Sequence, residues 1–576
     1  MKQVFFLLSF CSFISSSGQK IQTLTQFETS NGRETPTYQE IVAWWQKLDN
    51  LSGKVKMLTM GMTDAGYPLH LVLIANNGDH NFHNIKKNNK RVILVNNGIH
   101  PGEPDGIDAS MLLARDIAEN RYRIADNVVL AIIPVYNIGG CLNRSANFRV
   151  DQNGPDEFGF RGNSQNLDLN RDAIKCDSKD ARAFTEIFHL TDPDVFVDNH
   201  VSNGADYQHV MTLLTTQHSK LGGEMGKYLH DEFEPEIYRL MSSKGFDMVP
   251  YVNSFGDTPE NGWPEYWDSP RYASGFAALW NTFSFVPEAH MLKPYDQRVR
   301  GTYALMQSFI EFTAKNSASI KSHRDQARKN VSLQTEFPIA WTLDRSQFSE
   351  ITYIGYEAGR KPSEVSGLPR LYYDRSKPFE KKVKIFDHYV PKTTIQKPKG
   401  YIIPQGWWKV TDLLKLNKVK MIQFKKDTTI TVEAYKIEDY KTLPRQYEMH
   451  HLNSDVKVSV TTQQVKFSKG DWYIPMDQPA NRFLIETLEP QAEDSYFAWN
   501  FFDAILGQKE GFSGYAFEDI AADYLKNNPD LQNRLRDRKS SDTSFANSAR
   551  AQLNFIYQNS PWYEPAHMRY PVYRAK

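Results

Sequence analysis

Between about residues 54 and 315, short apolar runs rich in β-branched residues alternate with stretches of helical periodicity. The clearest apolar runs are 91–95, 128–133, 195–197 and 282–286. Continuous apolar runs of this length are typical of strands that are buried on both faces of a sheet. Between the first two runs, Pro104 opens a helical segment with one apolar face, formed by Ile107, Met111, Ala114 and Ala118. The pattern predicts an α/β domain whose sheet is covered by helices on both sides.

The pattern changes after about residue 330. Residues 456–460 alternate between apolar and polar side chains, and 468–471 read as a turn, which is typical of half-exposed antiparallel strands. The segments 406–417 and 514–526 are helical in pattern. We therefore predict two parts, an α/β domain over 19–330 that carries the candidate catalytic residues and a mainly β accessory region with helices over 331–576. A sandwich is one possible arrangement of the second part.

The N-terminus resembles a secretory signal over residues 1–18, with one lysine, an apolar run and then small residues. A buried N-terminal strand is the alternative interpretation. Lipidation at Cys11 is disfavoured because the bulky Phe10 precedes it. The sequence thus predicts an exported protein, periplasmic or extracellular. Removal of the signal leaves Cys141 and Cys176, which either form one disulfide or remain two buried thiols.

Composition excludes several classes of partner. The chain has 576 residues, with 68 Lys+Arg against 68 Asp+Glu, so it has no basic excess of the kind that nucleic acids or anionic membranes attract. Hydrophobic residues make up 40%, too many for a disordered chain. After the signal, no segment is long and apolar enough to predict a membrane span.

Polar residues of specific types follow the predicted strands. His100 and Glu103 come after the first run, His200 after the third, and Glu288 after the fourth. In an open α/β sheet, ligands bind beyond the carboxyl ends of the strands. Two histidines and a glutamate match a catalytic zinc site, which has three protein ligands and an open fourth position. Glu288 would lie beside the metal, where a carboxylate can take a proton from a zinc-activated water.

A polar loop over 160–172 lies between the two halves of this predicted site. It contains two arginines, Arg161 and Arg171. Arginine binds carboxylates in bidentate fashion. One arginine is therefore expected to anchor a substrate carboxylate, and the other to stabilise a developing oxyanion. The signatures of His-Glu-x-x-His zinc enzymes, serine hydrolases and P-loop proteins are all absent from the sequence.

With these motifs in order, the chain resembles the zinc carboxypeptidases of the M14 family over roughly residues 35–315. His100-Pro101-Gly102-Glu103 is similar to the family's His-x-x-Glu zinc motif, and Asp168-Leu169-Asn170-Arg171 to its Asp-x-Asn-Arg motif. His200 resembles the third ligand and Glu288 the catalytic glutamate. The resemblance implies a mixed, mostly parallel eight-stranded sheet flanked by helices, with one Zn²⁺ bound by His100, Glu103 and His200.

The resemblance also implies roles for other residues. Asp168 would orient His100, and Asn170 with Arg171 would hold the C-terminal carboxylate of the substrate. Arg161 would polarise the scissile carbonyl, with Arg144 and Arg149 as nearby competitors. The tyrosine that closes over the substrate would be Tyr272, with Tyr266 as the alternative. Five other histidines are expected outside the ligand set: His189, His209 and His290 as hydrogen-bonded neighbours, and His450 with His451 as solvated residues.

The expected function is that of an exported metallocarboxypeptidase. Its partners would be peptides or proteins with a free C-terminal carboxylate, and Glu288 would be the general base. Two alternatives stay open at this point. One is a zinc amidase or deacylase acting on cell-wall peptides, and the other is an exported binding protein without catalytic activity.

Overall fold

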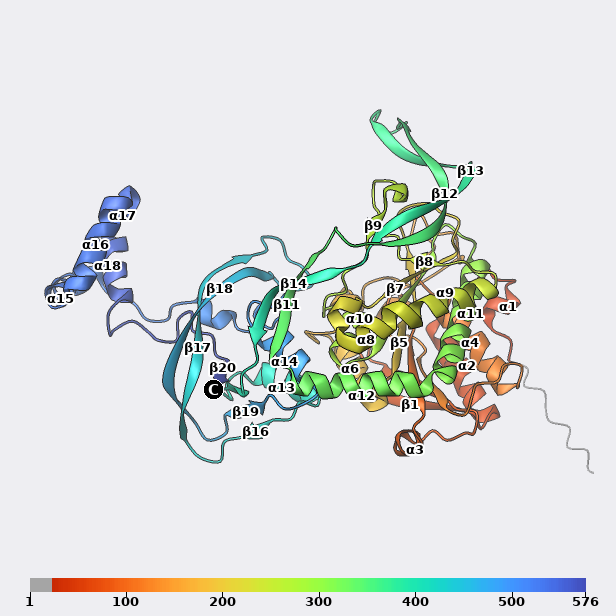
Figure 1. Cartoon of the computed structure of the whole chain (residues 1–576), viewed down its shortest axis with the longest axis horizontal. Coiled ribbons are helices and arrows are strands. Elements are labelled where there is room, and N and C mark those ends of the chain that lie inside the picture. The colour runs from red at the N-terminus through yellow and green to blue at the C-terminus, as the bar shows by residue number, and fades with distance from the viewer. Residues whose placement is uncertain (1–22) are drawn as a thin grey trace, which may run out of the picture.

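The computed structural model describes residues 23–576 (Figure 1). The predicted signal segment, 1–18, lies outside the described residues.

A nine-stranded mixed sheet forms the centre of the N-terminal half. The strand order is β1-β2-β4-β3-β5-β10-β7-β8, with β6 pairing β10. The pairs β3–β4, β3–β5, β10–β5, β10–β6 and β7–β8 are parallel, and β1–β2, β2–β4 and β10–β7 are antiparallel. The strands are β1 (Val55–Met62), β2 (Pro68–Ile74), β3 (Arg91–Asn96), β4 (Val128–Ile133), β5 (Val195–Asp198), β6 (His200–Ser202), β7 (Met211–Thr215), β8 (Val249–Pro250) and β10 (Phe283–His290).

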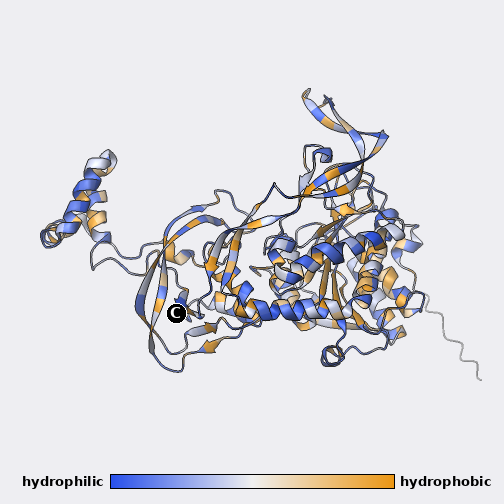
Figure 2. Cartoon of the chain, in the orientation of Figure 1, coloured by the Kyte–Doolittle hydropathy of each residue, from blue (hydrophilic) through white to orange (hydrophobic). Residues whose placement is uncertain are grey.

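The predicted mixed, mostly parallel sheet is confirmed, with nine strands rather than eight. β5 and β6 follow each other with only Asn199 between them, and both pair with β10. The strands β3, β4 and β5 are buried along their whole length. Figure 2 shows the strands in the interior of this half as largely hydrophobic.

Helices flank the sheet on both sides (Figure 1). α11 packs against α4 and α9 and contacts β3, β4, β7 and β10, whereas α6 contacts β1 to β3 and α10 contacts β5 and β10. Thr37 and Glu40 form a capping box at the start of α2. The longer helices are α2 (Tyr38–Leu51), α4 (Asp105–Ala118), α6 (Lys179–Thr191), α9 (Glu234–Ser243), α10 (Ala273–Leu279) and α11 (Tyr295–Lys315). The shorter ones are α1 (Gln26–Thr29), α3 (Phe82–Lys87), α5 (Ile138–Leu142), α7 (His218–Leu221), α8 (Gly223–Tyr228), η1 (Leu169–Arg171), η2 (Leu229–Phe233) and η3 (Pro259–Asn261).

The C-terminal region is β-rich, as predicted, but it is not a sandwich of two facing sheets. α12 (Ser317–Leu333) leads into a two-stranded ribbon of β11 and β14, and a six-stranded sheet follows in the order β16-β19-β15-β20-β17-β18. These strands are β11 (Glu336–Leu343), β14 (Tyr389–Gln396), β15 (Gly400–Ile403), β16 (Ile422–Gln423), β17 (Thr428–Thr442), β18 (Asn453–Phe467), β19 (Trp472–Pro475) and β20 (Tyr573–Ala575). The helices within this part are α13 (Trp408–Leu416), α14 (Asn481–Leu488) and η4 (Asp503–Leu506).

A long hairpin of β12 (Ser349–Pro362) and β13 (Pro369–Phe386) projects from the molecule (Figure 1). Its base docks on the N-terminal half, where β13 pairs with β9 (Trp263–Pro264). Buried aromatic residues from both sides, Tyr207, Trp263 and Tyr353, pack together there.

Four helices form a separate unit that stands away from the rest of the chain (Figure 1). They are α15 (Gly514–Lys526), α16 (Pro529–Ser541), α17 (Thr543–Ala546) and α18 (Ala549–Gln558). This helical unit has its own small apolar cluster, which includes Phe517, Leu531 and Ile556.

The nine-stranded half and the six-stranded sheet share one continuous apolar core that extends from Phe27 to Val572. At the boundary, the rings of Trp280 and Phe483 lie 5.2 Å apart, and Nε2 of His189 lies 3.1 Å from Oδ1 of Asn417. The two halves are therefore packed against each other and not joined by an open linker.

Candidate metal centre and active site

His100 and Glu103 lie in the turn that connects the carboxyl end of β3 to α4. Gly102 lies between them, and a side chain at this position would clash, because a Cβ would approach Cδ of Arg149 to 2.9 Å and the carbonyl oxygen of Gly159 to 3.0 Å. The turn therefore fits tightly against its neighbours and carries both side chains into the interior, where His100 and Glu103 are 2% and 3% exposed.

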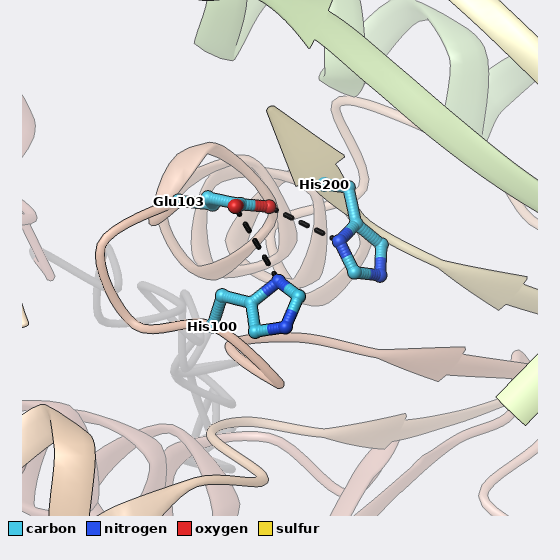
Figure 3. A group of neighbouring side chains, drawn as sticks. All are labelled: His100, Glu103 and His200. Carbon is cyan, nitrogen blue, oxygen red and sulfur yellow. Dashed lines mark hydrogen bonds and ion pairs between the residues drawn. The ribbon is translucent and has the colours of Figure 1, made fainter. Parts of the chain in front are cut away.

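His200 is the first residue of β6, and its side chain meets the other two (Figure 3). Nδ1 of His200 lies 3.0 Å from Oε2 of Glu103, and Nδ1 of His100 lies 3.3 Å from Oε1. One ligand atom from each residue lies within 4.8 Å of the others, and no other group of this kind is found between residues 23 and 576. Two imidazole nitrogens and one carboxylate are a donor set that suits zinc and leaves a position for water or substrate.

A carboxylate orients each histidine by contacting Nε2, the ring nitrogen that does not face Glu103. Nε2 of His100 lies 2.9 Å from Oδ1 of Asp168, and Nε2 of His200 lies 3.0 Å from Oδ2 of Asp198. A proton held at Nε2 leaves the lone pair of Nδ1 free for a metal, so this arrangement fixes the tautomer that a ligand needs.

Asp198 is a functional candidate that the sequence interpretation does not assign. Its signal is the Asp-x-His spacing at the end of an apolar strand, because residues two apart along a strand project from the same face. Asp198 is fully buried and also accepts a hydrogen bond from the side chain of Asn96, at 2.9 Å.

Glu288 lies on β10 directly beside the metal-binding group. In the parallel pairing of β10 with β6, Glu288 is the register partner of His200. Burial raises the pKa of Glu288 to about 8, with the imidazole of His200 opposing the rise and the carboxylate of Glu103 adding to it. A bound divalent cation would lower this pKa and favour the ionised, proton-accepting form.

Arg161 and Arg149 both reach the metal-binding group. Nη1 of Arg161 lies 3.3 Å from Nδ1 of His100, and its Nη2 lies 2.9 Å from Oδ2 of Asp168. Arg149, which the sequence interpretation ranks below Arg161, lies 2.7 Å from Oε1 of Glu103. Arg144 is outside the site, where it donates to the backbone carbonyls of residues 35, 36 and 157.

Asn170, Arg171 and Tyr272 come together at another part of the same cavity. The guanidinium carbon of Arg171 lies 4.6 Å from the centre of the Tyr272 ring, and Oδ1 of Asn170 accepts the backbone N–H of Ala273 at 3.2 Å. Tyr266, the alternative closing tyrosine, packs edge-on against Tyr272 with 5.6 Å between ring centres. Both tyrosines therefore lie at the site, and Tyr272 is the one in contact with Arg171.

A single cavity of about 350 Å³ joins these groups. Its lining includes the candidate ligands, Glu288, both arginine positions of the polar loop, Asn170 and the two tyrosines. Among the other lining residues are Leu214, Tyr251, Ser274 and Val286. The residues that the sequence predicts to act together thus share one space.

The remaining histidines and the cysteines lie outside the metal-binding group. His189 and His209 have side-chain and backbone partners, while His290 stacks on Tyr207 with 4.1 Å between ring centres. The prediction that His450 is solvated is wrong, because its Nε2 lies 2.8 Å from Oδ2 of Asp177 in the N-terminal half. Cys141 and Cys176 are both buried free thiols.

The segment that contains the three candidate metal ligands matches a known protein family. Residues 41–207 match the family model described as zinc carboxypeptidase, of peptidase family M14. The matched segment contains His100, Glu103 and His200, whereas Glu288 lies beyond it. The resemblance that the sequence motifs indicate is confirmed over this segment. No curated protein matches the chain.

Several of the solved structures that are similar to this chain are carboxypeptidases. A metallo-carboxypeptidase from Burkholderia cenocepacia is 14% identical with a TM-score of 0.36, and the alignment covers 48% of this chain and 69% of that one. A metallo-carboxypeptidase from Pseudomonas aeruginosa is 14% identical with a TM-score of 0.37, covering 48% and 68%. Carboxypeptidase A from Helicoverpa armigera is 13% identical with a TM-score of 0.37, covering 49% and 74%.

Between residues 23 and 576, no helix combines the length and the apolar character that crossing a bilayer would require.

Proposed function

We propose that this chain, which carries a zinc carboxypeptidase domain of the M14 type, removes C-terminal residues from peptides or proteins. The observation that carries the proposal is the convergence of three groups in one cavity of about 350 Å³. These are the His100–Glu103–His200 donor set, the half-buried carboxylate of Glu288, and the Asn170–Arg171 pair. Each supplies one requirement of the reaction: a metal site, a proton carrier and a carboxylate anchor.

His100, Glu103 and His200 would hold the zinc ion. A zinc ion bound there would supply Lewis acidity, which activates water and polarises a carbonyl group. The chain's own contribution begins with Glu103, whose carboxylate also accepts the backbone N–H of Val201 at 2.9 Å and is thereby fixed in place. The positive charge of Arg149 and the imidazole of His100 hold the pKa of Glu103 well below its usual range despite its burial, so it stays ionised.

Glu288 would transfer the proton. As a carboxylate it accepts a proton from the attacking water, and as a carboxylic acid it returns that proton to the amine of the leaving residue. Its half-buried position on β10, opposite His200 and on the cavity wall, keeps the carboxylate close to the proposed metal site.

Arg161 would stabilise the oxyanion that develops on the scissile carbonyl. Its guanidinium lies within reach of the metal ligands, held by two bonds to Asp168 of 3.0 Å and 2.9 Å. Arg161 is also the more exposed of the two arginines, with 45% of its side chain accessible against 20% for Arg149, so its guanidinium is the more open to a substrate. Asn170 and Arg171 would hold the free C-terminal carboxylate, so that the terminal peptide bond is the one presented to the metal.

The apolar part of the cavity predicts a preference for neutral C-terminal side chains. The lining residues Leu214, Val286 and Ser274 carry no charge, and the acidic lining residues Glu103 and Glu288 belong to the proposed metal and proton-transfer groups. A cationic side chain would be buried there without a free carboxylate, beside arginines that line the same cavity. We expect kcat/KM for peptides that end in Leu or Phe to exceed that for peptides that end in Lys or Arg by at least about tenfold.

Hydrolysis of a panel of peptides with different C-terminal residues, with and without a chelator, tests both the function and the preference. Loss of activity on chelation and its recovery with zinc are expected. Preference for Lys or Arg would contradict the proposed pocket. A chain that binds no stoichiometric zinc and cleaves no peptide would contradict the proposed function and favour a binding protein.

Asp198 is expected to tune the metal affinity. The variant D198N keeps an oxygen that can accept the Nε2 proton of His200 but removes the negative charge. We expect zinc affinity to fall by about 10- to 100-fold, because groups that orient a ligand have effects of this size. Competition with a chromophoric chelator measures the change. D116N, on α4 and bonded to Tyr303 at 2.7 Å, is the matched control, and an equal loss in both variants would contradict the role.

We also propose that the protein is exported, on the strength of the signal-like segment 1–18. N-terminal sequencing of the protein recovered from outside the cytoplasm would test this.

A further inference from the structure

A tight turn of the C-terminal region reaches the active-site loop of the N-terminal half. The turn is Tyr447–His450, between β17 and β18, and its two end residues pair through backbone bonds of 2.8 Å and 3.0 Å. The two central residues, Glu448 and Met449, have positive φ angles of 49° and 69°. Hairpin turns with two left-handed residues usually contain Asn-Gly, because other side chains are disfavoured there.

We therefore expect contacts with the rest of the protein to stabilise the left-handed backbone conformation at Glu448. Strained conformations persist where the surrounding structure fixes them, and they concentrate at functional sites. Oε2 of Glu448 accepts the backbone N–H of Asp168 at 2.9 Å. Next to it, Nε2 of His450 lies 2.8 Å from Oδ2 of Asp177, which ties the turn to the same half of the molecule a second time.

Asp168 is the residue through which this contact reaches the reacting groups. Its carboxylate lies 2.9 Å from Nε2 of His100 and 2.9 Å from Nη2 of Arg161. It also accepts the backbone N–H of Asn170 at 2.9 Å, which sets the start of the segment that carries Arg171. Only Asp168 therefore lies between Glu448 and three proposed functional groups. These are the zinc ligand His100, the oxyanion-stabilising Arg161 and the segment that anchors the substrate carboxylate.

The same C-terminal region also holds the segment that carries the two tyrosines. Glu493 accepts a hydrogen bond from Oγ of Ser269 at 2.6 Å and one from the indole of Trp267 at 3.3 Å. The buried Asp494 accepts the backbone N–H of Arg271 at 2.8 Å, and its other oxygen lies 2.9 Å from Nε of the same arginine. Both loops that line the substrate side of the cavity are therefore fixed from outside the nine-stranded half.

We propose that the region 331–576 positions the active site, and that Glu448 is the positioning residue that sets the Asp168–Arg171 segment. The proposal rests on the proposed carboxypeptidase function for its catalytic consequence. The positioning contact itself is independent of the reaction that the site performs. Glu448 acts through Asp168 and touches neither substrate nor metal.

Two substitutions at the same position separate the contact from the turn. E448N keeps a residue that tolerates positive φ, but its side chain is one methylene too short to reach Asp168. E448Q keeps both the length and an oxygen that can accept the N–H. E438N is the matched control, because Glu438 lies on β17 of the same hairpin and bonds to Ser459 on its exposed side.

Amide hydrogen exchange over residues 160–172, measured on the full chain with zinc and without substrate, reads the contact directly. We expect exchange in this segment to speed up by about tenfold or more in E448N and to stay at the wild-type rate in E448Q and E438N. With a peptide that has a free C-terminus, kcat/KM should fall by about tenfold in E448N, mainly through KM, and recover in E448Q.

Unchanged exchange over 160–172 in E448N would overturn the proposal, as would a loss in E448Q equal to that in E448N. If no variant and not even the wild-type chain cleaves peptides, yet exchange rises only in E448N, the proposed function fails while the positioning contact stands.

Discussion

Replacing Glu288 by glutamine is expected to lower kcat by about 10²- to 10⁴-fold while the chain keeps its zinc. Glutamine has the same shape as glutamate but cannot accept and return a proton. Glu288 is not among the three residues whose ligand atoms cluster, so the metal site should remain intact. Steady-state hydrolysis of a peptide with a free C-terminus, together with elemental analysis for zinc, measures both quantities.

The control for E288Q is E186Q, at an exposed position of α6 that is not part of the cavity lining. Near-normal turnover by E288Q would refute the proton-transfer role. Loss of zinc from E288Q would instead show that Glu288 helps to hold the metal.

The second large effect is expected at Arg171. R171A should lower kcat/KM for peptides with a free C-terminal carboxylate by about 30- to 1000-fold, which corresponds to about 2–4 kcal/mol for a desolvated charge pair. Amidated peptides lack the carboxylate and should be cleaved equally, and poorly, by R171A and by the unsubstituted chain. The ring of Tyr272, 4.6 Å from the guanidinium carbon, would lose its cationic partner in the same variant.

R161A provides the contrast for this measurement. Arg161 is proposed to act on the scissile carbonyl, which both kinds of peptide possess, so R161A should reduce the cleavage of free and amidated peptides by the same factor. Equal losses with both substrates in R171A would exclude the anchoring role. R171K should restore only part of the effect, because an ammonium group does not form the paired bonds of a guanidinium.

Much of the nine-stranded half can be predicted from the sequence because its strands are buried on both faces. Such strands have continuous apolar sequences, and β3, β4 and β5 coincide with three of the apolar runs from which strands are predicted. The convergence of His100, Glu103 and His200 then follows from topology, since the carboxyl ends of neighbouring parallel strands meet at one edge. Local spacing and a simple rule of sheet architecture are sufficient for this part.

The other contacts depend on partners that are distant in sequence. The contact between Asp168 and Glu448 joins residues that are 280 positions apart in the sequence. The contact between Asp177 and His450 joins residues that are 273 positions apart. Nothing near Glu448 in the sequence marks it as part of an active site, and a Glu-Met pair does not resemble a usual hairpin turn. Arg149 and Arg161 are both arginines at plausible spacing, and only the fold shows that Arg149 is paired with Glu103.

The helical unit of α15 to α18 leaves the C-terminal sheet and returns to it at nearly the same point. The backbone N–H of Met568 donates to the carbonyl of Ile505 at 2.9 Å, and Nε2 of His567 lies 3.2 Å from the carbonyl oxygen of Leu506. A segment whose two ends are already in contact can change in length or sequence with little effect on the conformational entropy of the remaining chain. We therefore expect the rest of the fold, including the loops that hold the active site, to tolerate insertions, deletions or replacement within the helical unit.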